Sequence, residues 1–293
     1  MTAPGTGKEK LARLAADPSS RLLLRGELFI SYKRHVDGGL HQTPKELVEF
    51  VTSIGADVFF YHWTESSLPS DLQEAKALCS KAGLGFGLTI DGPFERLAKA
   101  EGLLSLLQEM GRRSSALKRR IAAKVEMFEK DLRTIGIIQG EPVLICEDMA
   151  YDRSMYFSPL IFREWLLPIY RRLFAVLSLP GSLWGWHSDG NLLPILPDLV
   201  NLGTRFFSLE AECVDLLEFK RQYRDQVTLI AGLRTAWLLE EGWELEEDLS
   251  WVEEIRALVE EGGLILSSTC GLHDAPSLLR LRKIYRTLDA SAR

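Results

Sequence analysis

His187 and Asp189 stand two residues apart in the segment Trp184-Gly-Trp-His-Ser-Asp-Gly-Asn191. Side chains alternate between the two faces of an extended strand, so these two side chains are expected to point to the same side. Gly190 follows directly and allows the chain to turn sharply. A histidine and a carboxylate on one face can ligate a metal ion or transfer protons. The simpler interpretation is a histidine that a neighbouring carboxylate orients, with no catalytic role.

Two further residues could complete a metal site with this pair. Glu210 follows a later apolar run, and Cys270 follows the last such run of the chain. Zinc binds imidazole nitrogen, carboxylate oxygen and thiolate sulfur in tetrahedral sites. We therefore expect a zinc site formed by His187, Asp189, Glu210 and Cys270, although no local spacing enforces it. The simpler interpretation of Cys270 is a small buried residue.

Asp148 is the candidate for proton transfer beside His187 and Asp189. It stands next to Glu147 at the end of an apolar run, and adjacent residues of a strand face opposite sides. Only one of the two can face the functional side. We expect Asp148 to be catalytic and Glu147 to support it. The following loop contains Tyr151, which could cover a substrate or simply lie on the surface.

Basic residues are the candidates for binding an acidic substrate. Lys33, Arg34 and Arg234 follow expected strands, and arginine can hold a carboxylate or phosphate through two parallel hydrogen bonds. Ordinary surface charge is the alternative. All five histidines also follow expected strands, namely His35, His41, His62, His187 and His273. We place His62 and His273 among the substrate-binding residues.

A repeated strand–helix pattern would position these groups. Short apolar runs predict strands at 27–32, 57–61, 85–90, 142–146, 182–186, 205–209, 227–231 and 263–267. Amphipathic patterns predict helices near 44–54, 69–82, 94–135, 158–178, 191–202, 214–223, 248–261 and 275–288. Eight alternating units predict an α/β fold, a (β/α)8 TIM barrel, whose active sites form at the carboxyl ends of the strands. An open doubly wound sheet is the alternative. However, no GxGxxG follows the first expected strand and no GxxxxGK[ST] occurs.

The domain organisation follows from the same pattern. We expect a flexible N-terminal tail over 1–20 and a single barrel domain over 21–293. The stretch 94–140 is too long for one barrel helix, and it predicts two helices inserted between strands three and four. Its basic run from Arg112 to Lys124 is interpreted as a solvated helix face. Pro168 predicts a kink or break within 158–178.

Composition excludes several classes of protein. The net charge of −6 over 293 residues argues against a dedicated nucleic-acid binder. No apolar run reaches the roughly 18–20 residues that a membrane span needs. The first residues contain no apolar signal core, and the four cysteines form no CxxC pair. These features predict a cytoplasmic protein with reduced thiols.

The segments Glu147–Ala150, Ser158–Pro168 and His187–Asn191 carry a resemblance to a known family. The acidic turn at Glu210, the stretch 215–220 and the stretch 262–267 extend it. Through them the chain resembles a divergent member of the uroporphyrinogen decarboxylase (URO-D) superfamily over about 140–290. That superfamily has a (β/α)8 fold and includes true uroporphyrinogen decarboxylases and cobalamin-dependent methyltransferases.

The resemblance implies a different chemistry for each branch. The methyltransferase branch implies a zinc site in which His187 matches a histidine, Glu210 an acidic ligand and Cys270 a late cysteine, while Asp189 replaces a cysteine. The chain lacks the DxHxxG motif of corrinoid proteins. A corrinoid (cobalamin) is therefore expected in trans, on a partner protein or as a free molecule. True decarboxylases carry an arginine-rich RQAGRY-like loop, where this chain has only two cations within 32–39.

Three hypotheses follow. The first is a methyltransferase-like barrel with a metal-centred site that activates a small-molecule or corrinoid-linked methyl donor or acceptor. The second is a metal-free decarboxylase or lyase that acts on a carboxylate-bearing, tetrapyrrole-like substrate. The third is a binding barrel without catalysis. All three predict a small-molecule ligand and no nucleic-acid or membrane partner, and they leave open whether the protein is a monomer or a homodimer.

Overall fold

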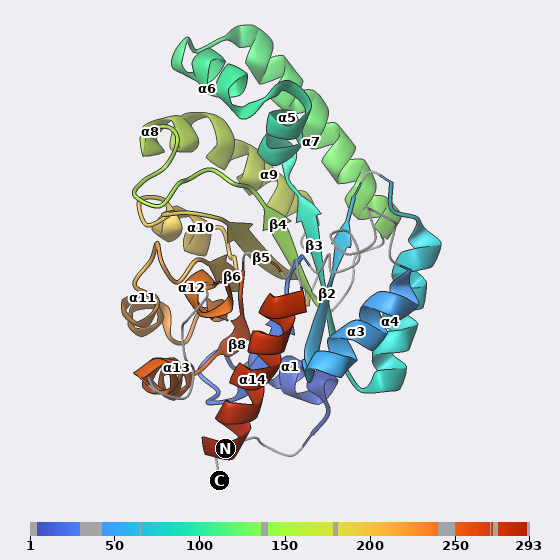
Figure 1. Cartoon of the computed structure of the whole chain (residues 1–293). Coiled ribbons are helices and arrows are strands. Elements are labelled where there is room, and N and C mark those ends of the chain that lie inside the picture. The colour runs from blue at the N-terminus through green and yellow to red at the C-terminus, as the bar shows by residue number, and fades with distance from the viewer. Residues whose placement is uncertain are drawn as a thin grey trace.

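Eight parallel strands pair in sequence order and close into a barrel in the computed structural model of the chain (Figure 1). The strands are β1 (Leu23–Glu27), β2 (Val58–Trp63), β3 (Gly85–Asp91), β4 (Pro142–Cys146), β5 (Leu183–Ser188), β6 (Phe206–Leu209), β7 (Thr228–Gly232) and β8 (Leu264–Ser267). The structure describes residues 5–29, 43–64, 66–135, 140–177, 181–239, 250–269, 271 and 275–291. The predicted (β/α)8 barrel is confirmed.

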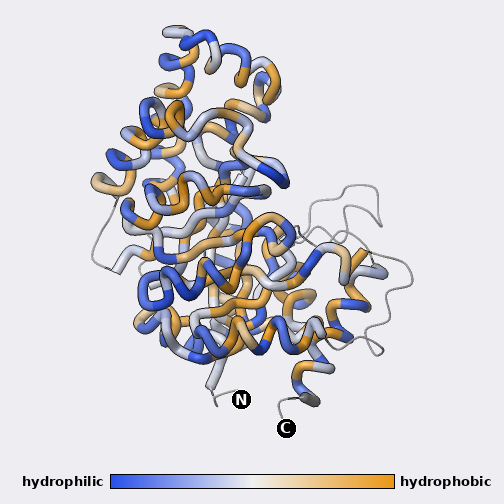
Figure 2. The backbone as a smooth tube through the Cα atoms, turned by 90° about the vertical axis from the view of Figure 1, so that its left-hand side faces the viewer, coloured by the Kyte–Doolittle hydropathy of each residue, from blue (hydrophilic) through white to orange (hydrophobic). Residues whose placement is uncertain are grey.

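Helices alternate with the strands and surround the barrel. They are α1 (Gly7–Ala16), α3 (Pro44–Ile54), α4 (Pro69–Ala82), α5 (Pro93–Glu101), α6 (Leu103–Gly111), α7 (Ser115–Ile135), α8 (Pro159–Ile161), η1 (Phe162–Leu166), α9 (Leu167–Leu177), α10 (Leu196–Asn201), α11 (Leu216–Tyr223), α12 (Thr235–Leu239), α13 (Ser250–Glu261) and α14 (Ala275–Ser291). Local sequence explains where they begin. The side chain of Thr43, for example, accepts the Glu46 N–H before Pro44 at the first helical position. Figure 2 shows hydrophobic and hydrophilic positions alternating along these helices.

The core has two parts because strand side chains alternate between the two faces of the sheet. One part fills the barrel and includes Val58, Phe60, Leu144 and Phe206. The larger part lies between the strands and the helices and includes Trp63, Ile145 and Trp186. The inward positions turn polar towards the carboxyl ends of the strands, where His62, His187 and Ser208 follow the apolar layers. The barrel interior is thus filled by apolar side chains, and polar side chains line its mouth at the carboxyl ends of the strands.

The first residues differ from the expected flexible tail over 1–20. Residues Gly7–Ala16 form α1, which packs beside β1, β2 and β3. Its Leu11 and Leu14 join the cluster inside the barrel, and Lys10 Nζ lies 2.8 Å from Asp57 Oδ1. The capping box of Thr6 and Glu9 and the Leu11–Leu14 spacing are local helix signals that composition alone did not reveal.

The stretch 94–140 forms three described helices instead of two. Gly102 separates α5 from α6, and α6 and α7 project beyond the barrel at one end of the molecule (Figure 1). Leu117, Ile121, Val125 and Phe128 form the buried stripe of α7. At Pro168 the helix does deviate, through the π-helical turn η1 directly before α9. A proline lacks the N–H that a regular helix would use there.

The first strand also lies upstream of its expected position at 27–32. It spans Leu23–Glu27, so Glu27 ends it. Lys33 and Arg34 therefore do not directly follow β1, and both lie outside the described residues, as do Cys270 and His273. Arg25 and Gly26 interrupt the apolar run of β1, so this strand lacks the continuous apolar pattern that predicts a strand.

Two buried glutamates fix the ends of β1 and β4. Glu27 accepts hydrogen bonds from Ser268 N and from Tyr285 Oη, at 3.2 Å and 3.0 Å. Glu147 accepts the Phe94 and Glu95 N–H groups at the start of α5, at 3.2 Å and 2.6 Å. It also accepts a short hydrogen bond from the hydroxyl of Tyr170. Burial raises the pKa of Glu27 to about 7 and that of Glu147 to about 8, against partial compensation by these hydrogen bonds.

We expect the stability of the fold to fall between pH 6 and pH 8. The folded chain keeps a proton on Glu147 up to about pH 8, whereas the unfolded chain loses it near the ordinary value of 4.5. The folded state thus binds more protons in this window, and the contribution of Glu147 falls by on the order of 2 kcal/mol. Urea unfolding at both pH values measures the change. Glu147→Gln should remove most of the decrease in unfolding free energy between pH 6 and pH 8. Glu126→Gln, on the exposed face of α7, should leave this decrease unchanged. Equal slopes in all three proteins would contradict the assignment.

Candidate functional site

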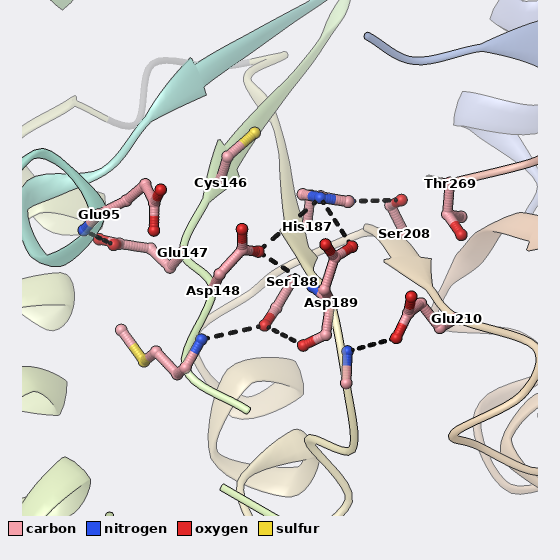
Figure 3. Close-up of polar contacts among 12 residues, drawn as sticks. Glu95, Cys146, Glu147, Asp148, His187, Ser188, Asp189, Ser208, Glu210 and Thr269 are labelled. Atoms are coloured by element: carbon pink, nitrogen blue, oxygen red, sulfur yellow. Dashed lines mark hydrogen bonds and ion pairs between the residues drawn. The ribbon is translucent and has the colours of Figure 1, made fainter. Parts of the chain in front are cut away.

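Three side chains meet at the carboxyl ends of β4 and β5 (Figure 3). His187 Nε2 lies 3.6 Å from Asp189 Oδ1 and 4.0 Å from Asp148 Oδ1. Asp148, His187 and Asp189 each offer a ligand atom, and these atoms lie within 4.8 Å of one another. The closeness expected for His187 and Asp189 from the strand period is present. Asp148 joins them from the neighbouring strand.

The pairing of β4 with β5 sets this geometry. Cys146 pairs with His187 in register, and the Glu147 N–H donates to the His187 carbonyl at 2.9 Å. Two residues after the pair of Cys146 and His187, just beyond the strands, the Asp189 N–H donates to Asp148 Oδ1 at 3.0 Å. Adjacent parallel strands therefore bring two carboxylates to Nε2 of a single imidazole.

Ser208 on β6 orients the imidazole from the other side. His187 Nδ1 lies 2.9 Å from Ser208 Oγ, and His187 itself is buried. When Nδ1 carries the proton and donates to Ser208, Nε2 presents its lone pair to the carboxylates. Burial lowers the pKa of His187, against the opposing effect of Asp148. The side chain is thus a neutral imidazole of the kind that ligates metals.

The carboxylates carry more negative charge than the protein compensates. Burial, followed by the charges of Asp148 and Glu210, raises the pKa of Asp189 to about 7. Asp189 Oδ1 is also a buried atom without a hydrogen-bond partner in the described part of the chain. Such an atom is costly unless a proton or a cation satisfies it.

The three residues fit a zinc ion. In a tetrahedral site, ligand atoms at about 2.0–2.2 Å from zinc stand about 3.3–3.6 Å apart. His187 Nε2 lies 3.6 Å from Asp189 Oδ1 and 4.0 Å from Asp148 Oδ1, so binding requires only a small inward shift of Asp148. One imidazole and two carboxylates are ligands that zinc accepts. A cation there would satisfy Asp189 Oδ1 and reduce the repulsion between the two aspartates.

Glu210 acts on the turn after β5. Its Oε2 accepts the Gly190 N–H at 2.7 Å (Figure 3). The same oxygen accepts a hydrogen bond from Cys213 Sγ at 3.1 Å. Gly190 has a φ of +79°, and a Cβ there would lie 2.5 Å from the carbonyl carbon of Ala150. The turn that positions Asp189 therefore requires glycine and is fixed by Glu210. Of the four expected zinc ligands, the compact cluster contains His187 and Asp189, with Asp148 in addition.

Gly190→Ala is expected to displace Asp189. A left-handed backbone costs a non-glycine residue about 1–2 kcal/mol, and the contact with Ala150 adds to this cost. We expect a loss of at least about 2 kcal/mol of stability and at least tenfold weaker zinc binding. Chemical denaturation and zinc titration measure the two effects. Gly203→Ala is the matched control, because Gly203 has a φ of +91° but no neighbour within 4 Å of the added Cβ. Gly203→Ala should lose stability through backbone strain and bind zinc with wild-type affinity.

The other expected substrate-binding residues occupy different places. His62 lies in β2, with Nδ1 2.9 Å from Thr89 Oγ1, and its pKa is lowered to about 4 by burial. The ring of Phe29 lies between the two histidines, with its centroid 5.3 Å from His62 and 4.8 Å from His187. His62 thus belongs to the same mouth as His187.

Arg234 and Tyr151 make their contacts with residues outside the cluster of Asp148, His187 and Asp189. The guanidinium of Arg234 lies 2.6 Å from Glu254 Oε1 and donates to the Ala211 carbonyl at 3.2 Å. It lines a cavity of about 490 Å3 together with Glu212, beside α11 and α13. Tyr151 is 44% exposed and stacks on Tyr156 at 5.9 Å between ring centroids. An arginine that already has a carboxylate partner is a poor candidate for binding a second one.

Sequence reasoning missed Ser208 and chose Tyr151 rather than Tyr156. Ser208 lies within the apolar run before Glu210 and two residues from it, so the strand period places both side chains on one face and could have indicated Ser208. Burial, then the charges of Asp148 and Asp189, raise the pKa of Tyr156, so its phenol is within electrostatic reach of the cluster. Tyr156 is therefore the better candidate than Tyr151 for contacting a ligand there.

No family model matches the chain, and no curated protein matches its sequence. Solved structures match it in fold. A methyltransferase from Methanosarcina mazei aligns with a TM-score of 0.72 at 16% identity, over 99% of this chain and 100% of that one. A Listeria monocytogenes protein assigned as a vitamin-B12 independent methionine synthase aligns with a TM-score of 0.56 at 14% identity, over 92% and 97% of the two chains. The D-psicose 3-epimerase of Clostridium cellulolyticum H10 aligns with a TM-score of 0.56 at 10% identity, over 91% and 99%.

These similarities show a shared barrel that extends over nearly the whole chain. They agree with the (β/α)8 fold that the sequence predicts, and at 14–16% identity they show the fold alone. Within the described residues no helix combines the length and hydropathy that a membrane crossing requires.

Proposed function

We propose that the chain is a methyltransferase-like enzyme of the URO-D superfamily, with a zinc ion held by Asp148, His187 and Asp189. The observation that carries the proposal is the cluster itself, with its partnerless buried Asp189 Oδ1 beside a neutral imidazole. The fold similarity to a methyltransferase over the full chain supports the reaction class. Glu210 and Cys270 remain candidates for additional ligands.

The protein's own residues would prepare the site for a small acceptor or donor. A bound zinc ion would lower the pKa of an acceptor's acidic group or polarise it. Ser208 holds the His187 ring at 2.9 Å, and Glu210 holds the turn that carries Asp189. Tyr156 is the candidate to contact the ligand, because the charges of Asp148 and Asp189 act on its phenol and, after burial, raise its pKa. The methyl group would come from or go to a corrinoid supplied in trans.

Metal analysis of protein purified without a histidine tag tests the proposal. We expect one zinc per chain, removable by chelator and restored by zinc but not by magnesium, because imidazole suits zinc. Cobalt substitution should give the visible absorption of a low-coordinate site with nitrogen and oxygen ligands. Methyl transfer from methylcobalamin to a panel of small thiols should require the metal. Absence of stoichiometric metal, with chelator-insensitive turnover, would overturn the proposal.

A metal-free decarboxylase or lyase is the second candidate, and one observation favours it. Burial raises the pKa of Asp189 to about 7, so this carboxyl can carry a proton at neutral pH and donate it to a carbanion. Its test uses the same chelated protein with tetrapyrrole-like polycarboxylates. Release of carbon dioxide that survives chelation and is lost in Asp189→Asn would favour this candidate over the first.

A further inference from the structure

Strained backbone follows the ends of β1 and β8. Among the described residues, three positions other than glycine have a positive φ, namely Phe29 at +52°, Arg113 at +53° and Thr269 at +57°. This conformation is unfavourable for an aromatic or β-branched residue. Phe29 lies two residues after the end of β1, and Thr269 lies two residues after the end of β8. Strained residues of this kind cluster at functional sites and persist only where the surrounding structure fixes them.

The hydrogen bonds of Glu27 fix both strained segments. Its Oε2 accepts Ser268 N at 3.2 Å and Ser268 Oγ at 2.7 Å, which joins the end of β1 to the end of β8. Its Oε1 accepts the hydroxyl of Tyr285 on α14 at 3.0 Å. The chain is therefore held directly before Phe29 and before Thr269, so a local shift of either strand end cannot release the strain.

The backbone at Phe29 places its ring against two imidazoles of the barrel mouth. The ring centroid of Phe29 lies 4.8 Å from that of His187, with the ring planes inclined at 58°. It lies 5.3 Å from that of His62, with the planes at 72°. Both separations are within the range of aromatic contacts, about 4.5–7 Å. Phe29 is half-buried and also packs on the apolar cluster inside the barrel, so its own ring is held in place.

The polar contacts of His187 act on its two nitrogen atoms. Nδ1 lies 2.9 Å from Ser208 Oγ, and Nε2 lies 3.6 Å from Asp189 Oδ1 and 4.0 Å from Asp148 Oδ1 (Figure 3). A rotation of the imidazole about its Cβ–Cγ bond would withdraw Nδ1 from the serine and Nε2 from the carboxylates together. An aromatic ring packed against the imidazole opposes this rotation, and Phe29 is placed to do so.

We propose that Phe29 is a positioning residue that keeps the His187 imidazole directed at the two aspartates. The strained backbone, maintained through Glu27, holds the phenyl ring on the imidazole. A functional side chain is held precisely only when packing and hydrogen bonds of its neighbours fix its rotamer. The orientation of His187 is a property of the metal-free protein, whereas the expected effect on zinc affinity rests on the proposed function.

NMR of metal-free protein with 15N-labelled histidine tests this orientation, and the signals of His187 are identified by their loss in His187→Gln. At a pH where the imidazoles are neutral, we expect one tautomer in the wild type. Phe29→Leu should give a mixture of both tautomers, because the imidazole can then rotate away from Ser208. It should also bind zinc at least about tenfold more weakly. Leucine keeps an apolar side chain at this half-buried position, so the variant is expected to fold.

Phe86→Leu is the matched control for the loss of a phenyl ring. Phe86 is 5% exposed and belongs to the core between the strands and the helices, away from the imidazoles. This variant should lose stability and keep both the wild-type signals of His187 and the wild-type zinc affinity. Wild-type signals of His187 in Phe29→Leu would overturn the inference. A wild-type protein that binds no zinc would overturn the proposed function instead, and the NMR comparison would still decide the role of Phe29.

A comparison of glycine with alanine tests the strain itself. Phe29→Gly and Phe29→Ala both lack the ring, but glycine adopts a positive φ without steric cost. Phe29→Gly should therefore unfold at a higher urea concentration than Phe29→Ala, which is the reverse of the usual order. Arg113, between α6 and α7, should show the same order of its glycine and alanine variants with unchanged signals of His187. The usual order at Phe29 would overturn the inference, since the ring would then be held without strain.

Discussion

His187→Gln is expected to lower zinc affinity by at least about 100-fold and to abolish turnover. Loss of an outer partner of a metal ligand typically costs about 10–100-fold in affinity, so loss of the ligand itself should lie at or above the upper end. His187 is the only nitrogen ligand in the cluster of Asp148, His187 and Asp189, and both carboxylates face its Nε2. Competition titration with a chromophoric chelator measures the affinity.

Two further variants test whether the loss of zinc affinity is specific to His187. Ser208→Ala removes only the partner of His187 Nδ1 and should weaken zinc binding by about 10–100-fold. His62→Gln removes a histidine of the same mouth and should leave zinc stoichiometry and affinity at wild-type values. Zinc binding that survives in His187→Gln but fails in His62→Gln would move the metal site away from β5.

Gly92→Ala is expected to lower the free energy of unfolding by about 3 kcal/mol or more. A Cβ on Gly92 would lie 2.0 Å from Glu147 Oε1, which belongs to a buried carboxyl group. Glu147 cannot move without leaving the Phe94 and Glu95 N–H groups and the Tyr170 hydroxyl unsatisfied in the core. Leaving a buried donor without its acceptor costs about 1–3 kcal/mol. The displacement affects the two N–H groups and the Tyr170 hydroxyl together, so we expect a total of about 3 kcal/mol or more. Urea unfolding at pH 7 measures the loss.

Gly111→Ala provides the matched control for this prediction. Gly111 ends α6, and a Cβ there would meet no atom within 4 Å. Alanine is favoured over glycine in a helix by roughly 0.5–1 kcal/mol, so this variant should be as stable as the wild type or slightly more stable. Equal stability of Gly92→Ala and Gly111→Ala would mean that Glu147 does not hold the start of α5.

The barrel could be predicted from the sequence because each strand–helix unit carries its own local pattern. The strand Pro142–Cys146 and the helices that begin at Pro44 and Pro69 lie where their apolar runs and prolines indicate. The exceptions are elements whose pattern is interrupted. Leu23–Glu27 contains Arg25 and Gly26, so its apolar run is broken although the strand closes the barrel.

The candidate site was predictable only as far as strand geometry reaches. The period of two places His187 and Asp189 on one face, and their roles remain predictions. The ion pair between Arg234 and Glu254 could not be predicted, because Glu254 lies on α13, twenty residues further along the chain. Likewise, Glu210 contacts Gly190 through the shape of a turn, which no pattern of residue types encodes.

The hydrogen bonds of Glu27 have a consequence for the order of folding during synthesis. They join the first strand to Ser268 and Tyr285, so the barrel closes between segments made some 240 residues apart. A nascent chain that still lacks β8 and α14 therefore carries β1 with one unpaired edge, and Glu27 stays hydrated and ionised. Until β8 and α14 have left the ribosome, the sheet stays open and its unpaired edge can pair with other chains. A chaperone would be needed during this period.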